Sequence, residues 1–232
     1  MGSVVIAKFG GSTIGVDGIS IPVIIQRISS ISKNAKVIAV FSAPLTVVEG
    51  KRTSLTDVVL ELGNRAKEGR TSDLIILKNT YEKILELVSS EFQDECKKII
   101  DDCLDKVRIE LEKAMEKKEF SDEIRSKTLA YSGEILMSYV MEYILQSQGI
   151  KSKTVKLENW PIITDNNIEY TNFVASESNK RLEHLERLLD QTQVITIGGF
   201  IGRTTDGIVT TYERGGSDRT AADLGILLHK KF

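Results

Sequence analysis

Short runs of consecutive apolar residues recur along the chain and predict buried strands. The clearest runs are Val4–Ala7, Lys36–Phe41 and Val194–Ile197. Unbroken runs of this length, rich in β-branched residues, are typical of strands that are covered on both faces. Between the first two runs, isoleucines recur at helical spacing, so we expect a helix over residues 19–32. This strand–helix–strand unit predicts a mostly parallel sheet and an α/β fold.

A long segment with helical spacing, from about residue 55 to 149, separates the second strand from the third. Apolar residues keep a helical spacing over residues 96–111, and breaks are expected at Gly69 and at Ser89–Ser90. A crossover between two parallel strands needs far less helix than this. We therefore expect a helical insertion beside the sheet.

Weaker patterns predict the remaining elements. We expect a polar loop over residues 45–54, and short strands over residues 152–155 and 162–164. Residues 207–212 fit a hairpin strand or an extended run. Further helices are predicted over residues 175–189 and 219–230.

Composition narrows the class of protein. The chain has 232 residues, of which 41% are hydrophobic and 28% charged, which suits one large domain or a domain with an insertion. The formal net charge of -2 gives no general reason to expect nucleic-acid binding. We find no apolar run of about 18 residues and no signal-peptide pattern, so we expect a cytoplasmic protein with no membrane span.

The cysteines and histidines offer no clear redox or metal site. Cys96 and Cys103, if they share one helix, lie about 10.5 Å apart along its axis, too far for a disulfide. We expect them to be small buried side chains in a reducing compartment. The two histidines, His184 and His229, have no metal-ligand spacing, so no metal site built by the protein alone is predicted.

The first strand runs into Lys8-Phe9-Gly10-Gly11-Ser12-Thr13, which has the chemistry of a phosphate-binding loop. Paired glycines allow backbone N–H groups to approach an anion, and a lysine supplies a point charge for phosphate. The spacing is not that of a Walker A motif. An ordinary glycine turn after a strand is the alternative.

Two further stretches point to the same edge of the sheet. Ser42 follows the second strand, and ligands of parallel sheets bind at the carboxyl ends of strands. The segment Arg214-Gly215-Gly216-Ser217-Asp218 precedes the last helix, where free N–H groups can bind an anion. Alternatively, Ser217 or Asp218 is only the N-cap of that helix.

Glu134 stands among apolar residues, next to a glycine in a helical context. It is either an exposed helix position or a pocket carboxylate that can hold an ammonium group. Lys8 could stabilise a phosphoryl group, while Arg214 could bind a carboxylate and Glu134 and Asp218 an ammonium. With hydroxyls from Ser42 and Thr56, these groups suit a phosphotransferase that acts on an amino acid.

Five motifs, in order along the chain, resemble those of aspartokinases, which belong to the amino acid kinase family. They are K-F-G-G-S-T, F-S-A-P, S-G-E-I-L-M-S, G-G-F-I-G and T-T-Y-E-R-G-G-S-D-R-T-A-A. The resemblance implies a three-layer α/β/α fold and phosphorylation of the L-aspartate side-chain carboxylate by ATP with Mg²⁺. The product is 4-phospho-L-aspartate, the first intermediate toward lysine, threonine and methionine. A homodimer is also implied.

The resemblance also assigns roles to individual residues. Lys8 would stabilise the transferring phosphoryl group together with Asp218 as a catalytic residue. The phosphoryl path would be lined by Gly10, Gly11 and Ser12. The residues that would hold aspartate are Ser42, Thr56, Glu134, Arg214, Ser217 and Asp218. The loop before Thr56 is longer than in the family, and Thr53 is the alternative at that position.

One departure from the family bears on activity. Aspartokinases continue beyond the R-G-G-S-D helix into a part that grips the nucleotide and then into regulatory ACT domains. We therefore expect residues 1–232 to be an amino acid kinase catalytic domain that is incomplete at its C-terminus, without an ACT domain and weakly active or inactive alone. The alternatives are a truncated or non-catalytic amino-acid-binding module, and a family enzyme with another acid acceptor.

Overall fold

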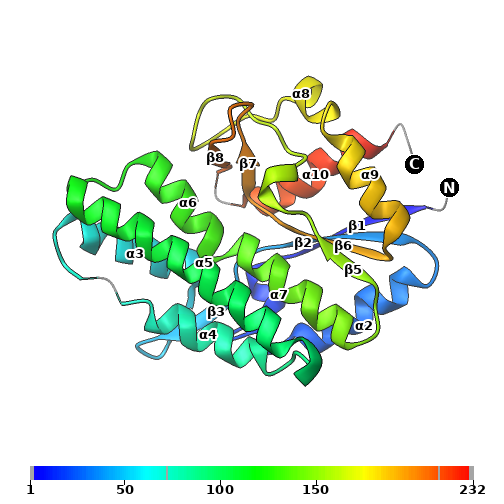
Figure 1. Ribbon diagram of the computed structural model, residues 1–232, viewed down its shortest axis with the longest axis horizontal. Coiled ribbons are helices and arrows are strands. Elements are labelled where there is room, and N and C mark those ends of the chain that lie inside the picture. Colours follow the sequence, from blue (N-terminus) through cyan, green and yellow to red (C-terminus); the bar gives the residue numbers. More distant parts are fainter. Residues whose placement is uncertain (1–2, 72, 214, 230–232) are drawn as a thin grey trace.

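The structure is a computed structural model that describes residues 3–71, 73–213 and 215–229. Figure 1 shows a layered molecule in which the sheet lies between two groups of helices. The strands of the main sheet are β1 (Val4–Phe9), β2 (Lys36–Phe41), β5 (Ser152–Thr154) and β6 (Val194–Gly198). Their order is β1-β2-β6-β5, and the neighbouring strands pair in parallel. The predicted parallel α/β sheet is confirmed.

Side chains of the central strand alternate between two hydrophobic cores. In β2, Val37, Ala39 and Phe41 face one core, whereas Ile38 and Val40 face the other. The first core also contains side chains of α2 (Ile21–Ser32) and α7 (Glu134–Ser147), below the sheet in Figure 1. The second contains side chains of α9 (Leu182–Gln191) and α10 (Gly216–Leu228), above it. The three-layer α/β/α architecture follows from this alternation.

The predicted helical insertion is present and joins the first core. Its helices are α3 (Leu55–Lys67), α4 (Ile75–Leu85), α5 (Ser90–Lys117) and α6 (Asp122–Ser132), followed by α7. Cys96 and Cys103 are both buried in α5 and carry free thiols, as expected. Gly133 separates α6 from α7, so Glu134 becomes the first residue of a helix.

Several boundaries differ from the sequence predictions. Residues 45–54 form a hairpin of β3 (Leu45–Val48) and β4 (Lys51–Ser54), not a loop. No strand forms over residues 162–164. Ile163 and Thr164 instead make isolated bridges to two different segments, at Arg203 and Phe173. The helix predicted over 175–189 is divided into α8 (Ala175–Asn179) and α9. Part of the second glycine-rich stretch is β7 (Ile201–Arg203), which pairs with β8 (Val209–Thr211).

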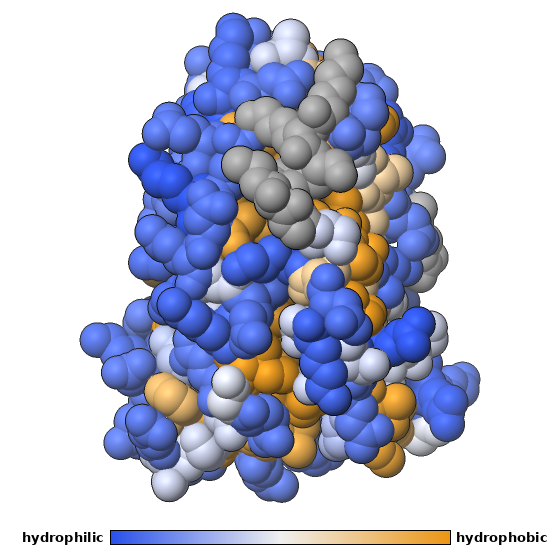
Figure 2. All heavy atoms as spheres, turned by 90° about the vertical axis from the view of Figure 1, so that its right-hand side faces the viewer, coloured by the Kyte–Doolittle hydropathy of each residue, from blue (hydrophilic) through white to orange (hydrophobic). Residues whose placement is uncertain are grey.

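The surface on the right-hand side of Figure 1 is mainly hydrophilic. Figure 2 shows this face with charged and polar residues around a broken band of hydrophobic ones. Within the part of the chain that the structure describes, no helix has the length and apolar character to cross a membrane.

Candidate functional site

The carboxyl ends of three strands lie side by side. Phe9, Phe41 and Gly198 are aligned by the parallel register, and the rings of Phe9 and Phe41 stack at 5.3 Å between centroids. The residues that follow these strands therefore meet at one edge of the sheet, where ligands of open α/β sheets bind.

Close packing after β1 requires glycine at position 11 and places Gly10 against the Lys8 side chain. A Cβ atom on Gly10 would lie 3.0 Å from the Lys8 ammonium, and one on Gly11 only 2.6 Å from the Ala43 carbonyl oxygen. The short helix α1 (Gly11–Ile14) begins at the second glycine, with Gly10 as its N-cap. The loop thus lies between the Lys8 side chain and the end of β2.

The ammonium of Lys8 lies 3.1 Å from the carboxylate of Asp218, in the first turn of α10. The Lys8 side chain is 27% exposed and that of Asp218 is 75% exposed. The lysine is therefore held at the pocket edge by a carboxylate that stays open to solvent. Both groups remain accessible to a reactant.

A second contact joins the end of β2 to α10. The hydroxyl of Ser42 donates to the Ser217 hydroxyl oxygen at 2.9 Å, and Ser217 is buried. The N-cap of α10 is Gly215, with φ of 90°, so the alternative that Ser217 or Asp218 is only the N-cap of this helix is wrong. A left-handed residue at this position favours glycine.

Glu134 is buried, with 5% of its surface exposed, so the exposed alternative is wrong. Burial raises the pKa of Glu134 from 4.5 to about 7, although the backbone N–H groups of Ala43 and of Glu134 itself act in the opposite direction. A ligand ammonium would offset the cost of keeping this carboxylate ionised.

These groups line one cavity of about 790 Å³. The first turns of α3, α7 and α10 border it through Thr56, Glu134 and Ser217. Helix N-termini carry partial positive charge, so they favour an anionic ligand. Lys8 adds a full positive charge on the same side.

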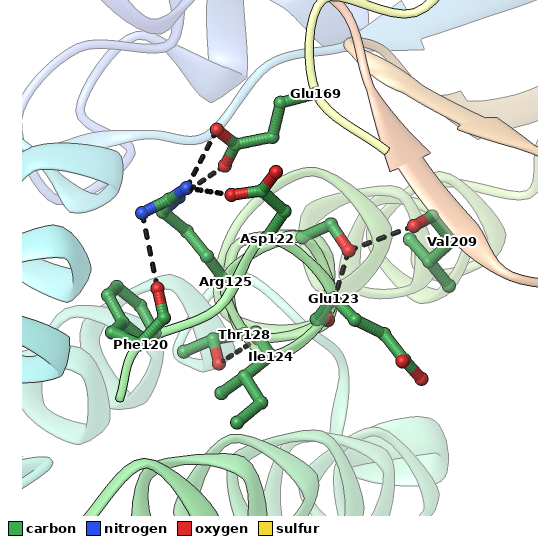
Figure 3. A network of polar contacts seen from close by, with 9 residues as sticks. Phe120, Asp122, Glu123, Ile124, Arg125, Thr128, Glu169 and Val209 are labelled. Carbon is green, nitrogen blue, oxygen red and sulfur yellow. Dashed lines mark hydrogen bonds and ion pairs between the residues drawn. The ribbon is translucent and has the colours of Figure 1, made fainter. Parts of the chain in front are cut away.

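Another wall of the cavity contains an ion pair that the sequence analysis did not predict. Arg125 of α6 binds Glu169 through two hydrogen bonds, one of them 2.8 Å from Nη2 to Oε2. The same guanidinium donates to Asp122 at 2.5 Å and to the Phe120 carbonyl at 3.2 Å. Figure 3 shows Arg125 extended from α6 toward these partners. The pair joins α6 to residues 165–173.

Two aromatic residues at the cavity were also missed by sequence reasoning. Phe200 and Tyr170 both line it, and their φ angles are 66° and 55°. Positive φ in non-glycine residues is uncommon and often occurs at functional sites. For Phe200 the G-G-F-I-G motif offered a signal.

The structure brings most predicted site residues together. The cavity is lined by Lys8, Gly11, Ser12, Ser42, Thr56, Glu134 and Ser217. Gly10 and Asp218 lie beside Lys8. Thr53 is in β4 and is not among the described residues that line the cavity, whereas Thr56 is. Arg214 lies outside the described residues.

Comparison with known proteins identifies the class to which this fold and site belong. The model of the amino acid kinase family matches residues 3–231, and the chain is a member of that family. The curated relatives that it matches include aspartokinases and bifunctional aspartokinase/homoserine dehydrogenases. One from Rickettsia felis is 34% identical over 100 residues, which are 43% of this chain and 24% of that protein. Aspartokinase 1 of Bacillus subtilis is 31% identical over 100 residues, again 43% and 24%.

A solved structure supports the fold over almost the whole chain. Aspartokinase III of E. coli, in complex with aspartate and ADP, superposes with a TM-score of 0.80 at 22% identity. The match covers 98% of this chain and 47% of that one. The chain therefore spans about half the length of that aspartokinase, and the resemblance indicated by the motifs is confirmed.

Proposed function

We propose that the cavity is the acceptor site of an aspartate kinase. The observation that carries this proposal is that Lys8, a buried Glu134 and the N-terminus of α10 border one cavity. An amino dicarboxylate has one ammonium and two carboxylates. Glu134 is suited to the ammonium, while Lys8 and the helix N-termini are suited to the carboxylates.

The proposed reaction is a transfer of the γ-phosphoryl group of ATP. An oxygen of the aspartate side-chain carboxylate forms a bond to the γ-phosphorus, and the bond from phosphorus to the ADP oxygen breaks. ADP leaves with the electron pair, and the product is the acyl phosphate 4-phospho-L-aspartate. In this step Lys8 offsets the charge on the transferring group, with Gly11 and Ser12 along its path. Asp218 holds the Lys8 ammonium in place.

Mg²⁺ would enter this site with the nucleotide. Among the described residues, no group of three or more acidic, histidine or cysteine side chains could hold a metal ion. Mg²⁺ usually takes one or two protein carboxylates and the oxygens of substrate phosphates. Asp218 has an exposed carboxylate beside Lys8 and is the residue suited to this contact.

Incubation with ATP, Mg²⁺ and L-aspartate in the presence of hydroxylamine tests the proposal, because hydroxylamine traps an acyl phosphate as a hydroxamate. We expect aspartate hydroxamate and an equal amount of ADP. A panel of glutamate, acetylglutamate and carbamate at fixed ATP serves as the comparison. If the enzyme prefers any of these acceptors, the proposal that aspartate is the acceptor is wrong.

A second candidate is a module that binds the amino acid without phosphorylating it. The cavity residues Glu134 and Ser217 suit an amino acid whether or not a phosphoryl group is transferred. Titration calorimetry separates the two, because aspartate binding without ATP binding supports the binding module. If the kinase proposal holds, the protein acts in the cytoplasm at the first step toward lysine, threonine and methionine, as a homodimer.

A further inference from the structure

Tyr81 connects the helical insertion to the junction that carries Glu134. Its side chain projects from α4 and is fully buried. The hydroxyl donates to the carbonyl oxygens of Ser132 and Gly133, at 3.0 and 3.1 Å. These two residues form the break between α6 and α7, and Glu134 follows them directly.

The chemistry of this contact requires the tyrosine proton. Both partners are carbonyl oxygens, so the hydroxyl can only donate to them. Ser132 is the last residue of α6, and a carbonyl at the end of a helix lacks an intrahelical partner, so leaving it buried without one is costly. The Gly133 carbonyl also accepts the Met137 N–H at 2.8 Å, so Tyr81 adds a second donor to it. Burial and the nearby Glu134 charge raise the pKa of Tyr81 well above its ordinary value of 10.0, so the proton stays in place.

Close packing holds the same junction on its other sides. A Cβ atom on Gly133 would lie 2.8 Å from the Ala43 Cβ atom. One on Gly198, at the end of β6, would lie 2.9 Å from the Glu134 carbonyl carbon. The backbone of Gly133 and Glu134 therefore packs closely against the residues that end β2 and β6, and Tyr81 of α4 adds hydrogen bonds to it.

We propose that Tyr81 is a positioning residue for the acceptor, which fixes the peptides of Ser132 and Gly133 so that the Glu134 carboxylate faces the substrate ammonium. This inference rests on the proposed function. It extends the acceptor site to α4, even though Tyr81 is not among the described residues that line the cavity.

The variant Tyr81→Phe removes one oxygen and keeps the ring. Aspartate affinity is measured by titration calorimetry at 25 °C on the whole chain, and folding is checked by circular dichroism. We expect the Kd for aspartate to rise about 5- to 20-fold, the effect of one lost buried hydrogen bond. The KM for aspartate in the kinase assay should rise while kcat changes little.

Tyr143→Phe is the matched control. Tyr143 packs on Phe92 and lies about 13 Å from Glu134 along the axis of α7. Its aspartate Kd should match that of the wild type. Gly133→Ala is a second variant, which displaces the same peptide from the Ala43 side and should also weaken binding. If Tyr81→Phe does not fold, Gly133→Ala tests whether the position of this peptide controls aspartate affinity.

The outcomes separate the two proposals. Wild-type affinity for aspartate in a folded Tyr81→Phe or Gly133→Ala protein, even with a lower Tm, would overturn the positioning role and leave the proposed function intact. A wild-type chain that binds no aspartate would overturn the proposed acceptor and this inference together.

Discussion

Lys8, at the end of the first strand, and Asp218, in the last helix, form an ion pair of 3.1 Å at the mouth of the cavity. The pair joins parts of the chain that are 210 residues apart and places the lysine where the ends of β1 and β2 meet. The arrangement suits a lysine that stabilises charge on a transferring group rather than one that only stabilises the fold, since exposed ion pairs contribute little to stability.

Lys8→Ala should lower kcat for acyl phosphate formation by about 10²- to 10³-fold, because a preorganised charge at the reacting group is removed. The thermal unfolding temperature should change little. Lys33→Ala, at the end of α2, is the control and should retain full activity. Unchanged kcat in Lys8→Ala would remove the catalytic role from this lysine.

The stability of the folded chain should depend on the ionisation of Glu134. Burial raises its pKa from 4.5 to about 7, so the folded state favours the protonated form. This contribution is fully present below about pH 4.5 and is lost as pH rises to about 7, at a cost of up to about 3 kcal/mol. Urea unfolding at pH 5 and pH 7.5, for wild type and Glu134→Gln, measures it. The difference in unfolding free energy between wild type and Glu134→Gln should change between pH 5 and pH 7.5. A constant difference would contradict the raised pKa of Glu134.

Aspartate binding should have the opposite pH dependence, because the ligand ammonium pairs with ionised Glu134. Between pH 5 and pH 7.5 the Kd should fall by about 10- to 100-fold as the carboxyl group titrates near pH 7. Titration calorimetry in several buffers should detect proton release at the lower pH. In Glu134→Gln the affinity should be weak at every pH, and a persistent slope there would assign the titration to another group.

The Arg125–Glu169 pair should couple α6 to residues 165–173. Both side chains are mostly buried, at 27% and 20% exposed. In a double-mutant cycle of Arg125→Ala and Glu169→Ala, the coupling free energy of unfolding should be about 1–3 kcal/mol. The exposed pair Arg187–Glu183 on α9 is the control, with less than about 0.5 kcal/mol expected. Additive effects at Arg125 and Glu169 would show that the contact does not join the two segments.

Gly199→Ala should damage the acceptor site through α10. The added Cβ would lie 2.5 Å from the Ser217 Cβ atom, so the first turn of α10 must move away from β6. We expect a rise in the aspartate Kd and a loss of stability of about 1–3 kcal/mol from overpacking. In contrast, a Cβ atom on Gly225 of α10 would lie 3.9 Å from the Ile6 side chain of β1, so Gly225→Ala should stabilise the chain by about 1 kcal/mol. Wild-type affinity in Gly199→Ala would show that the contact between β6 and α10 is not needed for binding.

The strands were predictable because runs such as Lys36–Phe41 are buried on both faces and carry no competing signal. The β3–β4 hairpin was missed since its strands are only four residues long and partly exposed, and β4 begins with two charged residues. Among the site residues, those next to strand ends could be found from their motifs. Arg125 and Glu169 could not, because they are 44 residues apart and only the tertiary packing brings them together.

The bond between Ser42 and Ser217 spans 175 residues, and this has a consequence for how the protein is made. During synthesis the N-terminal strands and the helical insertion emerge first, whereas contacts of such sequence separation form slowly and late. The acceptor cavity has no complete wall until α10 docks on β1. A nascent chain can therefore bury much of its core before it can bind an amino acid, and ligand affinity should report the last stage of folding.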